Sequence, residues 1–201
     1  MQPFGQTQIA NLAIVKVGGS RISSLKDNTT EANTISAVWD FCLADELRKH
    51  LWSFSIKRVE IPASSTTPIN NFNFSYPLPN DLIRLIQVDT WTQLIGLNDY
   101  NNAVISQYSL EGNNILSNAP SPLAIRYAGM VSDTTQWDVS FVNVFASRLA
   151  QEICESITQS TSKDQLLTQG YKTALMAAVR ANALEKPPAA ISDGSWVIGR
   201  L

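Results

Sequence analysis

The 201-residue chain has few of the side chains on which catalysis and metal binding depend. It contains one histidine, His50, and two cysteines, Cys42 and Cys154. On one helix Cys42 and His50 would lie roughly 12 Å apart, too far for a nucleophile and its base. No P-loop, GxGxxG, GxSxG or HExxH motif occurs. The sequence therefore predicts no catalytic residue, no cofactor and no metal site, and not an enzyme.

Charge is also scarce. Only 16% of the residues are charged, the net charge is −2, and no basic run occurs. Sequence-specific DNA binding needs clustered lysine and arginine that neutralise phosphates, so the composition argues against it. No stretch reaches the roughly 18 apolar residues of a membrane span, and no signal-peptide pattern begins the chain. We therefore expect no membrane association, and we expect both cysteines to be buried, reduced thiols.

The segment 30–62 joins a helical pattern to a strand pattern. Its first part carries an apolar stripe at three- and four-residue steps: Ile35, Val38, Trp39, Cys42 and Leu43. After a short turn, Phe54 and Ile56 alternate, and Val59 and Ile61 alternate on the shifted phase. The one-residue slip predicts a β-bulge or a strand that is buried on both faces.

Two residues of the helical part do not fit a simple amphipathic helix. Phe41 points away from the apolar stripe, which predicts that a second element or a neighbouring subunit covers it. Glu46 lies within the stripe and must find a partner or mark the stripe's edge, because a buried carboxylate without one is costly.

The period changes from 3.6 to 2 over residues 53–132. Alternating apolar residues indicate strands at Phe72, Phe74 and Tyr76, and again at Leu123, Ile125 and Tyr127. Residues 111–114 read Glu-Gly-Asn-Asn, a turn between short strands. Several short strands with frequent turns predict a small sandwich or barrel.

Helical patterns frame these strands. Residues 1–19 predict a short helix with Thr7 as a candidate N-cap. Residues 137–157 carry the cleanest apolar stripe, with Asp138 as N-cap.

The end of the helical region gives three further expectations. Arg148 and Glu152 are expected on the exposed side of their helix. A capping box at 162–165 opens the last helix. Small residues of that helix, Gly170 among them, would permit a close helix–helix approach.

The predicted fold class is α+β with segregated layers. Residues 1–52 and 133–186 would form an antiparallel bundle of about four helices. A small β-sandwich or barrel over 53–132 would be inserted into it, and an extended tail would follow over 187–201.

Several motifs recur in a characteristic order along the chain. Trp39-Asp40 is followed by His50-x-Trp52-x-Phe54-x-x-Lys57-Arg58, residues 76–84 read Y-P-L-P-N-D-L-I-R, and the chain ends in W-x-x-x-R over 196–200. Similar elements occur at 9–25, 108–113 and 123–150. Together they resemble the tail tubular protein A family, the head-to-tail adaptors of short-tailed bacteriophages.

The resemblance implies a structural protein of the virion, located at the head–tail junction and made in the cytoplasm of the host bacterium. In this family twelve subunits form a ring between the portal protein and the tail nozzle. DNA passes through the ring without sequence-specific binding, during retention and ejection. A mildly acidic chain with few basic residues suits a lumen that must not hold phosphate.

The tail is the candidate segment for binding a neighbouring portal subunit. Trp196, Val197 and Ile198 would provide the apolar anchor and Arg200 a polar contact, with Phe41 as a second interface residue. Alternatively, the tail folds back onto its own helices.

Two other functions remain open. A ligand- or carbohydrate-binding β module on a helical scaffold would expose aromatic residues at 72–76 and at Trp91. A related head-completion protein would also form a ring below the portal, but such proteins are smaller and mostly helical, so the predicted sheet favours the adaptor.

Overall fold

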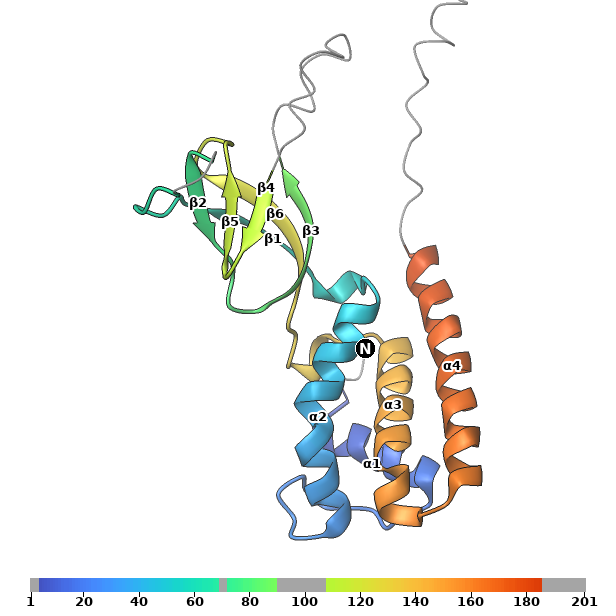
Figure 1. The fold of residues 1–201 in the computed structure, drawn as a ribbon. Helices are drawn as coiled ribbons and strands as arrows, with labels where there is room; N and C mark the ends of the chain where they lie inside the picture. The colour runs from blue at the N-terminus through green and yellow to red at the C-terminus, as the bar shows by residue number, and fades with distance from the viewer. Residues whose placement is uncertain (1–3, 69–71, 90–107, 186–201) are drawn as a thin grey trace, which may run out of the picture.

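Four helices and two small antiparallel sheets form a mixed α+β fold (Figure 1). This computed structural model describes residues 4–68, 72–89 and 108–185. The strands lie between the second and third helices in the chain, as expected for the α+β class. The predicted tail over 187–201 and Trp91 lie outside the described residues.

The helices pack around a central one. They are α1 (Gln6–Val17), α2 (Thr30–Lys49), α3 (Val139–Thr158) and α4 (Thr161–Leu184). Helix α3 contacts the other three, and α2 and α4 flank it (Figure 1). This position follows from its sequence, because ten of its residues are buried and a helix apolar on most sides needs neighbours on most sides.

An aromatic cluster fills the helical core. Phe145 meets Trp39 edge-on at a centroid distance of 4.9 Å, and Phe141 meets Trp52 at 5.0 Å and Trp137 at 5.1 Å. The indole N–H groups of both Trp52 and Trp137 donate to backbone carbonyls. These rings therefore add a large apolar area to the core without a buried, unsatisfied donor.

The predicted helix starts are only partly correct. Asp138 caps α3 as expected, accepting from a backbone N–H 3.0 Å away. Thr7, however, lies inside α1, because Gly5 is the N-cap and its N–H donates to a glutamine side chain three residues on. Helix α4 begins after Ser160, two residues before the predicted capping box, because a backbone bond to the Ser160 carbonyl closes its first turn.

Each sheet has three strands. One has the order β1 (Ile56–Ile61), β6 (Leu123–Gly129), β3 (Leu82–Asp89), and the other has β2 (Phe74–Pro77), β5 (Asn114–Ser117), β4 (Tyr108–Glu111). Residues of both sheets share one apolar cluster: Ile61, Tyr76, Val88, Ile115, Leu123, Ile125 and Tyr127. The alternation predicted at 123–127 is confirmed, as is the turn at 111–114, where Gly112 has φ 57°.

The predicted strand start at Phe54 is wrong. Residues Ser53–Ser55 form a 3₁₀ turn, and the Phe54 ring packs 4.9 Å from Phe141 in the helical core. Strand β1 begins only at Ile56, and it pairs with β6 in continuous register from Ile56 to Ile61, so the phase slip is not a bulge in this strand. The register shifts lie in β3, where it pairs with β6.

Two glycines provide a matched test of backbone conformation. Gly18 ends α1 with φ +84°, and a Cβ there would lie 2.9 Å from Lys163 Nζ. Gly170 lies on an exposed part of α4 where a Cβ meets nothing within 4 Å, so its expected place in a close helix contact is wrong.

We expect Gly18→Ala to lower the free energy of unfolding by about 1–2 kcal/mol and Gly170→Ala to raise it by about 0.5–1 kcal/mol. Urea titrations followed by circular dichroism measure both, and effects of the same sign would contradict this account.

Candidate functional site

The described part of the chain holds no group of three His, Cys, Asp or Glu side chains that could bind a metal. Within the same residues, no helix is both long and apolar enough to cross a bilayer. Cys42 and Cys154 are free and buried, as expected. Burial raises the pKa of Cys42 to about 11, so its thiol is protonated at neutral pH and is a poor nucleophile.

Helix α2 has a buried face and an outward face. Phe41 lies on the outward face with 67% of its surface exposed. None of the described elements covers it, and its cover by a second element or by a neighbouring subunit stays a prediction. Asp40 beside it is also exposed.

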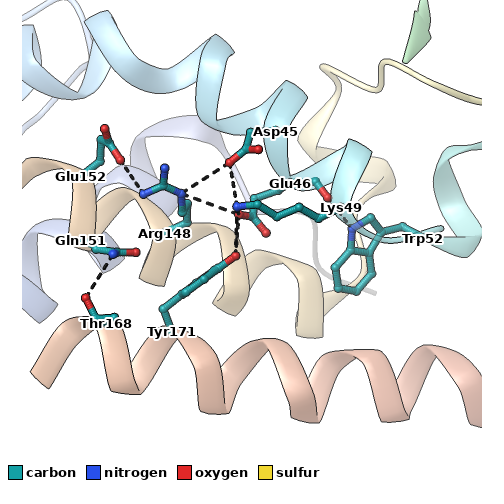
Figure 2. A network of polar contacts seen from close by, with 9 residues as sticks. All are labelled: Asp45, Glu46, Lys49, Trp52, Arg148, Gln151, Glu152, Thr168 and Tyr171. Carbon is teal, nitrogen blue, oxygen red and sulfur yellow. Dashed lines mark hydrogen bonds and ion pairs between the residues drawn. The ribbon is translucent and has the colours of Figure 1, made fainter. Parts of the chain in front are cut away.

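The buried face of α2 centres on Glu46, whose side chain is fully enclosed (Figure 2). Its Oε1 accepts a hydrogen bond of 2.8 Å from the Tyr171 hydroxyl and lies 2.8 Å from Lys49 Nζ. Lys49 Nζ also lies 2.7 Å from Asp45, and Arg148 Nε lies 3.8 Å from Glu46 Oε1. The partner that the sequence required for Glu46 is thus a set of groups on α2, α3 and α4.

Arg148 corrects a prediction. It was expected on the exposed side of its helix, but only 15% of its side chain is exposed. It does pair with Glu152, as its spacing indicates, yet its guanidinium is also 3.8 Å from Asp45. Arg148 is buried because α2 packs against α3 on this side and places the carboxylates of Asp45 and Glu46 beside its guanidinium.

The protonation behaviour of this network follows from its burial. Burial, and then the charge of Glu46, raise the pKa of Tyr171 to about 12. For Lys49, burial alone would lower the pKa, but hydrogen bonds with Asp45 and Glu46 outweigh it and raise the pKa. Because Glu46 is enclosed, no substrate can reach it. The network is therefore a clamp between helices.

Asn182, which the sequence analysis missed, ties the end of α4 to the turn after α2. Its Oδ1 accepts from the Ser53 N–H at 3.0 Å and from the Ser53 hydroxyl at 2.7 Å. Its Nδ2 donates to the Leu51 carbonyl at 3.1 Å and lies 2.9 Å from His50 Nε2. The only sequence signal is a polar residue on the apolar face of a helix.

A second polar group lies where the β6–β3 sheet approaches the helices. The Asp81 carboxylate accepts from Lys57 Nζ at 2.6 Å and from the Tyr127 hydroxyl at 3.0 Å. Burial would raise the pKa of Asp81, but these hydrogen bonds lower it. The motif Y-P-L-P-N-D-L-I-R predicts an entry into a strand after a turn, and the Leu82 N–H does donate to the Pro79 carbonyl at 3.0 Å to close that turn. The motif also supplies Asp81, which bonds to Lys57 and Tyr127.

Only one of the predicted interface residues is described. Phe41 is exposed, whereas Trp196, Val197, Ile198 and Arg200 lie outside the described residues. Of the aromatic residues that a glycan-binding face requires, Phe74 is exposed, whereas Tyr76 is fully buried and its hydroxyl donates to the Ala119 carbonyl at 2.6 Å. Tyr76 therefore belongs to the core between the sheets and does not contribute to a binding face.

No family model matches the chain, and no curated protein matches its sequence. The resemblance to the tail tubular protein A family therefore stays a prediction from motifs.

Tyr171→Phe tests the clamp. Removing the hydroxyl leaves Glu46 with one donor fewer in a buried site, so we expect the free energy of unfolding at pH 8 to fall by about 1–3 kcal/mol. An unfolded tyrosine loses its proton near pH 10 and folded Tyr171 near pH 12. The stability that this shift contributes is therefore present below pH 10 and is lost as the pH rises to 12.

The measurement is urea unfolding at pH 8 and pH 11. Tyr171→Phe should lose less stability than the wild type between these pH values, because it lacks the titrating group. Tyr108→Phe, at an exposed tyrosine of β4, is the matched control and should behave as wild type. A Tyr171→Phe protein with wild-type stability at pH 8 would show that the clamp is dispensable.

Proposed function

We propose that the protein is a structural subunit of the ring that joins the portal vertex to the tail nozzle of a short-tailed bacteriophage. Its partners would be the portal protein, the nozzle and further copies of itself, and DNA would pass through the ring without sequence-specific binding. In finer terms, we propose an antiparallel helical bundle with an inserted β-sandwich and an extended C-terminal tail. The apolar cluster shared by the two sheets supports the sandwich.

The exposure of Phe41 is the observation that carries this proposal. Single exposed apolar residues are common on soluble proteins. Here, however, the large aromatic side chain of Phe41 is exposed on helix α2, whose opposite face is held by the buried network around Glu46. Helix α4, on the other side of α3 in Figure 1, also presents large apolar side chains: Leu166, Met176 and Leu184.

The position of these residues favours a ring over a two-fold dimer. A symmetric dimer uses the same surface on both copies, whereas a contact between two different surfaces is repeated from copy to copy and gives a ring when its rotation closes, or a filament when it does not. Phe41 on α2 and the exposed apolar residues of α4 lie on two different helices. We propose that Phe41 of one copy packs against a different surface of the next.

Assembly of the purified protein tests the proposal. We expect native mass spectrometry and negative-stain imaging to show rings, either of the protein alone or after mixing with its portal. Phe41→Asp should abolish the rings, because it places a charge in an apolar contact. Leu110→Asp, at an exposed leucine of β4, is the control and should keep them. A wild-type monomer that ignores the portal would refute the proposed function.

Deleting residues 187–201 tests the proposed role of Trp196 and Arg200. If the tail binds the portal, the shortened protein keeps its melting temperature and loses portal binding in a pull-down. A melting temperature many degrees lower would instead indicate that the tail folds back onto its own helices, and would remove it from the proposed interface.

A further inference from the structure

The outer face of the β1–β6–β3 sheet carries a row of hydrogen-bond donors. Alternate residues of β6 fill the core between the two sheets, so Arg126 points to the opposite face. Arg58 of β1 lies directly opposite Arg126 on one side, and Gln87 of β3 lies opposite it on the other. Two guanidinium groups and one amide are thus placed side by side across three strands.

This arrangement is unfavourable as it stands. Like charges directly opposite each other on a sheet destabilise the strand pair. Within the described residues, neither Arg58 nor Arg126 has a carboxylate within 4.0 Å. The Nε of Arg126 is buried and has no hydrogen-bond partner in the same part of the chain. An unpaired, buried donor beside a repelling charge needs an explanation.

A hollow of about 520 Å³ lies over this row. Its lining includes Arg58, Glu60, Gln87, Ala124 and Arg126 of this face, together with the intervening Val59 and Ile125, and the small side chain of Ala124 leaves room between longer neighbours. Arg84 belongs to the next row of the same face, opposite Ala128, and does not line the hollow.

We propose that Arg58, Arg126 and Gln87 bind a carboxylate group presented by a partner polypeptide. A guanidinium donates two parallel hydrogen bonds to a carboxylate, and two arginines facing one another can hold its two oxygens together. The bound anion would remove the repulsion between the arginines and supply the acceptor that Arg126 Nε lacks. The inference does not depend on the proposed ring.

An acidic residue beside the row favours an isolated carboxylate over a nucleic acid. Glu60 lies at the register position opposite Ala124, one row away from the arginines. Successive rows on one face are about 6.6–6.8 Å apart, and phosphates follow one another closely along a strand of nucleic acid. A phosphate bound by the arginines would therefore bring its neighbours towards Glu60.

Fluorescence anisotropy on the full-length chain tests the site. The probes are a fluorescein-labelled, amidated decapeptide with one central Glu among Gly residues, the same peptide with Gln for Glu, and a labelled single-stranded DNA decamer. We expect the Glu peptide to bind the wild type and the Gln peptide not to bind. Arg58→Gln and Arg126→Gln should each raise the Kd at least about fivefold, because each removes one charge-assisted pair.

Arg84→Gln is the matched control, since it removes the same charge from the same face outside the hollow, and should change the Kd less than about twofold. Arg126→Lys keeps the charge without the planar fork and should weaken binding like Arg126→Gln. Melting curves check folding. Arg126→Gln should melt no lower than the wild type, because it relieves a like-charge pair. If Arg126→Gln does not fold, the Kd of Arg58→Gln for the Glu peptide tests the site instead, because Arg58 is exposed.

Three results would overturn the proposal. The wild type could fail to bind the Glu peptide at millimolar concentration. Arg84→Gln could weaken binding as much as the hollow variants, which would indicate a general charge effect. The DNA decamer could bind more tightly than the Glu peptide and lose binding in the same variants, which would make the row a phosphate site.

Discussion

One buried carboxylate, that of Glu46, determines how the three long helices meet. Enclosing a charge costs several kcal/mol, and here Lys49, Tyr171 and Arg148 compensate for it from three helices. A buried ionic network of this kind adds little net stability compared with apolar packing, but it penalises every arrangement in which the partners fail to meet. In this protein it reinforces the inward position of the apolar face of α2, from which Phe41 points away.

The helices and the sheets are coupled through short polar contacts. Arg48 at the end of α2 donates to the Ile83 carbonyl of β3 at 2.7 Å, and Lys57 at the start of β1 bridges Asp81 and the Met130 carbonyl. Asn182 joins the end of α4 to the same region of the chain. Hydrogen bonds that run across the junction restrain its orientation, so a partner that holds the helices also positions the sheets.

Some local features of this fold could be predicted from the sequence, although the predicted N-cap Thr7 and the capping box at 162–165 are not where their helices begin. Contacts between distant segments could not be predicted. The Asp138 cap and the turn at Gly112 depend on neighbouring residues alone, and both are where the sequence places them. The burial of Arg148 depends on which face of α2 arrives above it, and no spacing within α3 carries that information. The same holds for Asn182, whose partners are about 130 residues away. A polar residue on an apolar stripe, as at Glu46, signals a network but does not name its members.

Three exposed features of the described residues bear on the two proposals. They are the aromatic side chain of Phe41 on α2, apolar side chains on α4 and an arginine row on the outer face of one sheet, whereas the enclosed ionic groups hold helices and strands together. These surfaces lie on three different elements, so a single copy can contact more than one partner at once. A symmetric dimer would bury one of them and leave the others bare. A subunit with neighbours on both sides, and with a further partner at the sheet, uses all three.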